Sequence, residues 1–249
     1  GTLGEAEAAR APADGYTLLY TATPYSINPH LQKLPYDPKD LQPVTQVAVA
    51  PMFLAVGKSS PYKTFAELIK AGKLAPGKLN FSSGGQGTVQ YMGAELMLQA
   101  VGVKAAHVPY KSGGPGLQAI MAGEVDFGFG NVSALAGHVK GGLVRPLAIT
   151  SGTRNPNHAD VPTLAESGVK GYEVYEWNGI FVPAGTPREI VQRLNTALRE
   201  VLESTAVKAR IYALGARVVA SPSADFQQFL AKEGERWGAT VKAAGIRKE

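Results

Sequence analysis

The chain has 249 residues, of which 45% are hydrophobic, 18% are charged and none is cysteine. Apolar material on this scale supports one large domain or two smaller lobes, and it excludes disordered and fibrous proteins. The absence of cysteine excludes disulfides, thiolate metal sites and a cysteine nucleophile. The net charge of +5 comes from basic residues scattered along the sequence, whereas a nucleic-acid-binding surface would cluster them.

The first residues show an unusual start for an α/β chain. Residues 5–11 have a helical pattern, although an α/β lobe usually opens with a strand, so we expect a preceding strand–helix unit to be missing from this chain. The same region lacks the basic and then apolar pattern of an export signal. No apolar run approaches the ~20 residues that span a membrane, so the sequence predicts a soluble chain.

Further along, short apolar segments alternate with helical ones. The segments with strand character are 16–21, 44–56, 78–82, 105–108, 125–129, 144–150 and 172–182. Amphipathic helices are predicted at 186–204 and 223–244, where apolar residues recur at helical spacing. Repeated strand–helix–strand units predict an α/β fold of mostly parallel sheets with helices on both faces.

The expected helix ends are marked by capping residues. A threonine three residues before a glutamate predicts three helix starts, at Thr64 with Glu67, Thr163 with Glu166, and Thr186 with Glu189. In the third, we expect Pro187 at the first helical position, where its missing N–H costs nothing. Helix stops, where glycine takes the left-handed conformation, are predicted at Gly72, Gly102, Gly123, Gly168 and Gly215.

Two proline-rich, extended passages interrupt this alternation, near residues 56–61 and 175–187. We interpret them as crossings between two lobes. Residues 1–57 and 177–249 would form the first lobe, and residues 58–176 the second. The alternative is a single doubly wound sheet with long loops.

Familiar catalytic motifs are absent or incomplete. Residues 57–59 read Gly-Lys-Ser, but Met52 stands where a phosphate-binding loop needs a further glycine. Residues 128–133 mimic a dinucleotide fingerprint, yet residues 147–151 carry no carboxylate to hold a ribose. The four histidines lack metal-site spacing, and no serine lies in a Gly-x-Ser-x-Gly elbow. We therefore expect no cofactor, no metal and no enzyme activity.

Glycines and hydroxyl residues concentrate in a loop that follows a predicted strand and opens a helix at residue 89. Such a helix start presents unpaired N–H groups and a partial positive charge, which stabilise a carboxylate or phosphate without a basic side chain. The candidate ligand-binding residues here are Ser82, Ser83, Gly84, Gly85, Gly87 and Thr88. Alternatively, Thr88 only caps its helix, because capping and anion binding use the same geometry.

Other loops follow the same logic. Tyr110, Gly113 and Gly114 lie at the next strand-to-helix junction, and Asn131 lies at a third. All three loops should meet in one crevice, because ligands of open parallel sheets bind beyond the carboxyl ends of the strands. In the other lobe, Thr23 lies in the matching loop and Trp177 lies on the predicted crossing. The indole would wall the cleft or belong to the core.

Six segments, in order along nearly the whole chain, carry a family resemblance: 14–19, 82–95, 108–115, 147–150, 160–168 and 183–187. Together they resemble the Bug receptors, the substrate-binding proteins of the tripartite tricarboxylate transporter family. Each segment alone is weakly specific, but the ordered set is specific. Family members begin with an export signal, then a strand and a proline- and glycine-rich ligand loop, and this chain shows none of these.

The resemblance implies a periplasmic binding protein of the two-lobed, type II "Venus flytrap" class, which closes on a small carboxylate and delivers it to a membrane transporter. In that family, backbone amides and hydroxyls of loops from both lobes hold the carboxylate. Carried onto this chain, these loops are 82–88, 110–114, Asn131 and Thr23. The ligand would be a dicarboxylate, a tricarboxylate, an acidic amino acid or an aromatic acid, and the receptor would be a monomer that does not bind nucleic acid.

Two other functions would use the same crevice. One is an enzyme acting on a small anionic substrate, and the other is the effector-sensing domain of a transcription regulator. The sequence contains neither a paired acid and base nor a helix-turn-helix segment to support them. The receptor hypothesis predicts that a bulky residue in place of Thr88 weakens ligand binding with little loss of folding.

Overall fold

The computed structural model describes residues 1–246, and the chain divides into two compact units. Unit 1 contains residues 1–50 and the chain from residue 176 onward, and unit 2 contains residues 51–175. The crossings therefore fall at 50/51 and 175/176, whereas the sequence placed them at 57/58 and 176/177. The first one lies earlier because strand β2 (Leu41–Gly57) is buried almost throughout, so its hydrophobic pattern has no break at the boundary.

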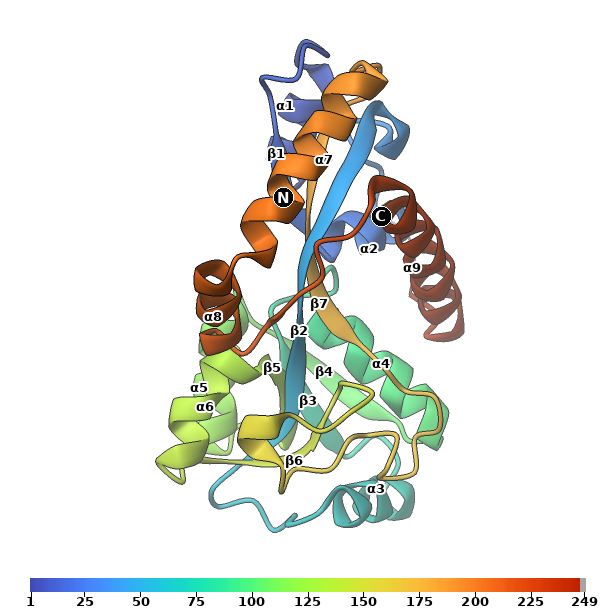
Figure 1. Cartoon of the computed structure of the whole chain (residues 1–249). Helices are drawn as coiled ribbons and strands as arrows, with labels where there is room; N and C mark the ends of the chain where they lie inside the picture. The colour runs from blue at the N-terminus through green and yellow to red at the C-terminus, as the bar shows by residue number, and fades with distance from the viewer. Residues whose placement is uncertain (247–249) are drawn as a thin grey trace. The chain divides into compact units, whose positions relative to one another are not determined.

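Unit 1 is built around strands β1, β7, β8 and the first part of β2. β1 pairs antiparallel with β7, β7 neighbours β2, and β8 pairs antiparallel with β2. The amphipathic α7 runs alongside the first part of β2 (Figure 1) and packs Val191 against Val44 and Val182. The elements of unit 1 beside β2 are α1 (Thr2–Arg10), β1 (Leu19–Ala22), α2 (Pro24–Leu31), η1 (Pro38–Asp40), β7 (Tyr175–Pro183), α7 (Arg188–Glu203), α8 (Thr205–Ala213), β8 (Arg217–Val218) and α9 (Ser223–Ala243).

Unit 2 contains the second part of β2 in a sheet of order β6–β2–β5–β3–β4. β3 runs parallel to both β4 and β5, and β2 runs antiparallel to β5 and β6, so the sheet is mixed. The elements of unit 2 beside β2 are α3 (Phe65–Leu74), β3 (Leu79–Ser83), α4 (Val89–Val101), β4 (Ala105–Pro109), α5 (Gly113–Ala122), β5 (Phe127–Asn131), α6 (Val132–Lys140), β6 (Val144–Ile149) and η2 (Pro156–His158).

The order of β3, β4 and β5 decides where the loops of unit 2 go. The chain moves outward from β3 to β4 and then returns past β3 to β5. Since such crossovers are right-handed, the reversal puts α4 on one face of the sheet and α5 on the other (Figure 1). The loops leaving β3 and β4 therefore part to opposite faces, and this switch point is where open α/β sheets bind ligands.

The expected fold class, α/β with sheets flanked by helices, is confirmed. The seven predicted strands all form, with ends displaced by up to three residues, and the two-residue strand β8 is additional. The prediction of mostly parallel sheets was wrong, because parallel pairing holds only between β3 and its neighbours β4 and β5 in unit 2. The antiparallel pairs all involve β2 or β7, the two strands at which the chain passes between the units.

The helix-end predictions were partly right. Thr64 accepts a hydrogen bond from the Glu67 N–H at 3.2 Å and caps α3. Gly72, in contrast, lies inside α3, and the prediction of a stop there was wrong: the helix continues to Leu74 because Gly72 lets it approach the side chains of Val103 and Leu79. The other four predicted stops, Gly102, Gly123, Gly168 and Gly215, have positive φ angles, but Gly168 follows a run of turns and ends no helix.

Two predicted capping boxes do not start helices as expected. Thr163 and Glu166 form both reciprocal hydrogen bonds, at 2.8 and 3.0 Å, but the residues that follow form turns. The Thr186 hydroxyl donates to the Pro183 carbonyl at 2.7 Å, and α7 begins later, at Arg188. Its N-cap is Pro187, so the predicted box at Thr186 and the predicted position of Pro187 inside the first turn were wrong.

Candidate functional site

A pocket of about 170 Å³ lies in unit 2, at the carboxyl ends of β3 and β5. The loop after β3, the first turns of α5 and α6, and the end of β5 form its walls. Six residues predicted from the sequence line it, namely Ser82, Ser83, Gly84, Gly113, Gly114 and Asn131. The structure therefore brings the three strand-to-helix loops of this unit together, as the parallel order of β3, β4 and β5 requires.

Two helix N-termini open into this pocket without a side-chain cap. Ser112 is the N-cap of α5 and Asn131 is the N-cap of α6, and neither side chain makes a capping hydrogen bond. The first N–H groups of a helix have no acceptor within the helix, so they bind caps, water or ligands. The two helices carry 10 and 9 residues, so each adds a positive end to the pocket.

The loop after β3 passes close to the start of α5. A Cβ atom on Gly84 would lie 3.3 Å from the Gly113 nitrogen, so the close approach of the two backbones at the pocket wall favours glycine at residue 84. The Ser82 hydroxyl donates to the Gly116 carbonyl at 3.1 Å and is committed to the structure. Ser83 accepts from the Gly85 N–H at 3.0 Å, makes a long 3.3 Å contact with the Gly85 carbonyl and meets His107 Nε2 at 2.7 Å.

The remaining lining is uncharged and mostly apolar. Leu117, Ile120, Phe129, Ala134 and Leu135 form the apolar walls, and Gln90 is a further polar group. Among the described residues that line the pocket, none is Lys, Arg, His, Asp or Glu. A negative ligand would therefore be held by N–H and O–H groups, and its hydrocarbon part would face Leu117, Ile120, Phe129 and Leu135.

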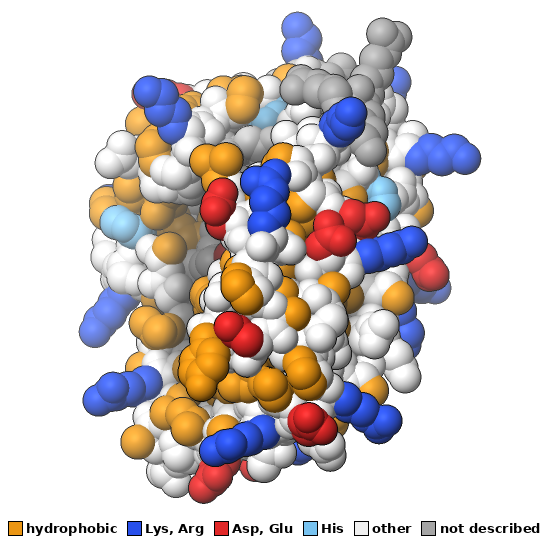
Figure 2. All heavy atoms as spheres, turned by 90° about the horizontal axis from the view of Figure 1, so that it is seen from above, with side chains coloured by type: hydrophobic (Ala, Val, Ile, Leu, Met, Phe, Trp, Pro, Cys, Tyr) orange, Lys and Arg blue, Asp and Glu red, His pale blue; other side chains and the backbone are white. Residues whose placement is uncertain are grey.

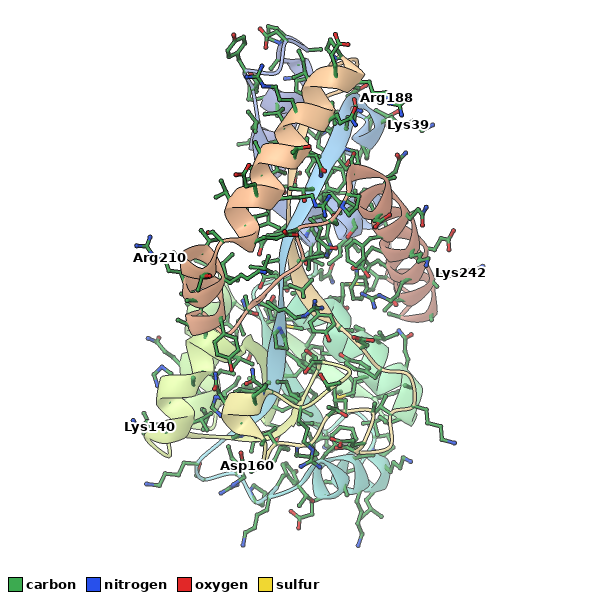
Figure 3. The ribbon with its side chains drawn as sticks, in the orientation of Figure 1. Lys39, Lys140, Asp160, Arg188, Arg210 and Lys242 are labelled. Carbon is green, nitrogen blue, oxygen red and sulfur yellow. The ribbon has the colours of Figure 1, made fainter. Side chains whose placement is uncertain are left out.

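Charged side chains are scattered over the views that Figures 2 and 3 draw. On the face that Figure 2 draws, positive and negative side chains alternate and no single-sign patch forms. In Figure 3 the labelled charged side chains start on different elements and extend away from the ribbon: Lys39, Lys140, Asp160, Arg188, Arg210 and Lys242. The face that Figure 2 draws therefore shows no continuous basic stripe of the kind that binds nucleic acid.

Four of the predicted ligand residues of unit 2 lie outside the pocket lining: Gly85, Gly87, Thr88 and Tyr110. The Thr88 hydroxyl accepts from the Tyr91 N–H at 3.3 Å, which caps α4, and donates its proton to the Gly85 carbonyl at 2.7 Å. Both bonds are structural, so a bulky replacement of Thr88 would remove a cap. Tyr110 packs at the edge of an apolar cluster of unit 2. Ligand contacts of these four residues stay predictions.

The two predicted residues of unit 1 contact each other. Thr23 and Trp177 are both fully buried. The Trp177 N–H donates to the Thr23 hydroxyl at 2.9 Å, and the indole makes edge contacts with Tyr25, Phe226 and Phe229. The indole therefore belongs to the aromatic core of unit 1. A direct role of Thr23 or Trp177 in ligand binding stays a prediction.

The sequence did not identify the apolar walls or Gln90. Leu117 and Ile120 lie three residues apart on one face of α5, and Phe129 is the middle residue of β5, so their spacing resembles that of ordinary core residues. One available signal was their position. Leu117 and Ile120 follow a predicted ligand loop within about two turns of helix, and Phe129 shortly precedes the predicted ligand residue Asn131, so all three lie where the adjacent wall of a pocket must be.

Two α/β units, linked by two chain crossings, and a pocket lined by backbone donors beyond the strand ends define a solute-binding protein. The chain belongs to the family described as "Tripartite tricarboxylate transporter family receptor", TctC, which it matches over residues 1–246. This is a family of binding receptors and not of enzymes. Family membership therefore decides against the two alternatives considered from the sequence, an enzyme and the sensing domain of a regulator.

Solved structures of similar proteins support the fold. Rpa4515 of R. palustris, determined with adipate, is 33% identical with a TM-score of 0.90, covering 100% of this chain and 84% of that one. The periplasmic binding protein BugD is 29% identical with a TM-score of 0.85, with the same coverage. MatC of Rhodopseudomonas palustris, with bound malate, is 30% identical with a TM-score of 0.81, covering 96% and 84%.

No group of three or more His, Asp or Glu side chains within residues 1–246 is placed to hold a metal ion. In the same part of the chain, no helix is long and apolar enough to cross a membrane.

Proposed function

We propose that the pocket of unit 2 binds the carboxylate of a small organic acid, and that this protein delivers the acid to a tripartite membrane transporter. The observation that carries the proposal is the meeting of two uncapped helix N-termini with the Ser83 hydroxyl in a pocket without charged side chains. Helix N-termini favour anions through both their N–H groups and their dipoles. The carboxylates bound to relatives of this family support the same ligand class.

The apolar walls favour one kind of acid. A volume of about 170 Å³ is close to that of an apolar cavity that accepts benzene, so it has room for a carboxylate and a few carbon atoms. A hydroxyl group placed against Leu117, Ile120 or Leu135 would lose its hydrogen bonds to water without gaining others, which is costly. We therefore propose an acid with an unsubstituted hydrocarbon chain or ring, such as adipate, over a hydroxy acid such as malate.

A thermal-shift and calorimetric series tests this function. The panel contains adipate, malate, glutamate, citrate and benzoate, and adipamide serves as the uncharged control that matches adipate in shape. A ligand at 100 times its dissociation constant stabilises the protein by about 2.7 kcal/mol, which the melting temperature reports. We expect adipate or benzoate to give the largest shift and adipamide none. Equal shifts from adipate and adipamide would contradict anion recognition, and no shift from any acid would contradict the proposed function.

The way the ligand is delivered is part of the same proposal. We propose that the receptor acts as a monomer in the periplasm and that its two units close on the acid, because a ligand shifts a two-state protein only through contacts that one state makes better. Small-angle scattering with and without the best ligand would detect closure as a smaller radius of gyration. An unchanged radius at saturation would contradict closure and leave carboxylate binding standing.

A further inference from the structure

A serine in the wall of the pocket contacts a histidine that lies outside the pocket lining. The Ser83 Oγ is 2.7 Å from Nε2 of His107, and Ser83 itself is 3% exposed. The pair joins neighbouring strands, since residue 83 ends β3 and residue 107 lies in β4. Ser83 lines the pocket and His107 does not, so the histidine reaches the ligand site only through the serine.

The direction of this hydrogen bond decides what Ser83 can offer a ligand. A hydroxyl has one proton and two acceptor lone pairs, and the Gly85 N–H already fills one lone pair at 3.0 Å. If Nε2 of His107 is an acceptor, the serine proton is donated to the ring and cannot reach a ligand. If Nε2 carries a proton, the ring fills the second lone pair, and the serine proton is free to turn to a carboxylate, away from its 3.3 Å contact with the Gly85 carbonyl.

The His107 ring is held in place by its neighbours. Its centroid lies 5.1 Å from that of Phe81 on β3 and 4.4 Å from that of Tyr91 on α4. Of the ionisable groups packed there, Tyr91 interacts with Glu95, and burial raises the pKa of that carboxyl. Burial also lowers the pKa of His107 below its usual value of 6.5, and no charged neighbour contributes to that shift. The ring is therefore neutral at pH 7 and gains its charge only in acid.

We infer that His107 is a positioning residue of the carboxylate site: its Nε2–H donates to Ser83 and thereby aims the serine proton at the bound anion. Because an anion beside the pair also favours a charged ring, ligand affinity rises as the pH falls through the titration of His107. This inference rests on the proposed function, and it names Ser83 and His107 as the side chains that set the affinity of the site for a carboxylate. The added contact is a hydrogen bond to a charged group, which corresponds to roughly 10- to 100-fold in affinity.

Three substitutions separate this role from a structural one. His107→Gln keeps an uncharged N–H donor near the Nε2 position, so we expect near wild-type affinity at pH 8 without the gain in acid. His107→Phe keeps the ring between Phe81 and Tyr91 but removes the donor, so we expect at least a tenfold loss at every pH. Ser83→Ala should lower affinity equally, and adding His107→Phe to it should cost nothing more, because the histidine acts through the serine.

The measurement is calorimetric titration of the full chain with adipate from pH 5 to pH 8, with melting temperatures to show that each variant folds. Glu95→Gln is the control for the second group that titrates nearby, and it should keep the wild-type pH profile. If wild-type protein binds adipate but His107→Phe binds it equally well, or the two single losses add in the double variant, the inference is wrong. If wild-type protein binds no acid of the panel, the proposed function fails first.

Discussion

The backbone of Trp177 is hydrogen-bonded to Thr23 in both directions. The Thr23 N–H donates to the Trp177 carbonyl at 3.1 Å, and the Trp177 N–H donates to the Thr23 hydroxyl at 2.9 Å. Thr23 also stands at the N-cap position of α2, so this pair fixes the start of that helix against β7. Two residues that the sequence placed near a ligand thus hold together the interior of unit 1.

Replacing the Thr23 hydroxyl by a methyl group should destabilise unit 1. Thr23→Val keeps the shape but leaves the buried Trp177 N–H without its acceptor, which costs about 1–3 kcal/mol of unfolding free energy. Urea denaturation followed by tryptophan fluorescence measures the loss. Thr196→Val removes a hydroxyl from an exposed position on α7 and should stay within about 0.5 kcal/mol of wild type. Equal stability of the two variants would show that the hydroxyl of Thr23 is dispensable.

Filling the pocket should abolish binding without unfolding the protein. A Cβ on Gly114 meets nothing within 4 Å, so Gly114→Leu can place its side chain in the pocket space beside α5. We expect adipate affinity to fall more than tenfold while the melting temperature stays near that of wild type. Gly137→Leu is the matched control, because Gly137 is also a helical glycine with open space but lies outside the pocket lining. Unimpaired binding by Gly114→Leu would place the ligand elsewhere.

Glu233 should make unit 1 less stable as the pH rises. The carboxylate is 4% exposed, is paired with Arg236 and accepts from Trp237 Nε1 at 3.0 Å, yet burial outweighs these contacts and raises its pKa above 4.5. The folded state thus binds the proton more tightly than the unfolded state. The stability of wild type relative to Glu233→Gln should therefore be highest below pH 4.5 and fall as the pH rises through the raised value.

Glu166 should change the stability of the protein with pH in the opposite direction to Glu233, because its pKa is lowered and not raised. The Thr163 N–H and the Arg154 side chain lower the pKa of its carboxyl, so its stabilising contribution is present above pH 4.5 and is lost as the pH falls through the lowered value. Urea midpoints of Glu233→Gln and Glu166→Gln from pH 3 to pH 7 should therefore diverge from wild type in different pH ranges. A common trend for both variants would refute the assignment of Glu233.

A methyl group on Gly179 should disrupt the core of unit 1. Its Cβ would come within 2.5 Å of the ring of Phe226, which is fully buried and cannot move aside easily. Overpacking of this kind costs about 1–3 kcal/mol, so Gly179→Ala should lower the unfolding free energy by that amount. Gly234→Ala, in an open position of α9, should be neutral or stabilising by up to ~1 kcal/mol. A Gly179→Ala protein as stable as wild type would mean that Phe226 has an alternative position.

The fold was predictable where local signals agree with long-range packing. Helix α4 forms at the predicted residues 89–101 because Thr88 and Gly102 both take their capping conformations. The pair Thr163 and Glu166 forms its hydrogen bonds without a helix, because a start signal does not extend a helix unless enough residues follow to offset the cost of nucleation. The predicted helix stop at Gly72 was wrong because α3 continues through this residue. Glycine at residue 72 instead leaves room for the side chains of Val103 and Leu79, which are distant in sequence.

The candidate site was predictable from topology more than from side chains. The parallel order of β3, β4 and β5 required their loops to meet, and Ser83, Gly113 and Asn131 do meet. The apolar walls could not be recognised, because a leucine that faces a ligand and a leucine that faces the core have the same sequence spacing. The serine–histidine pair depends on strand register, which residue spacing alone does not determine.

The uncapped starts of α5 and α6 have an evolutionary consequence. Every amino acid except proline carries a backbone N–H, so a substitution in these turns by any other residue keeps the groups that would hold an anion under the proposed function. Mutations can instead change the size and polarity of the walls formed by Leu117, Ile120, Phe129 and Leu135. Under the proposed function, selection can therefore shift the preference of the receptor from one acid to another, step by step, without removing the backbone donors that hold the carboxylate.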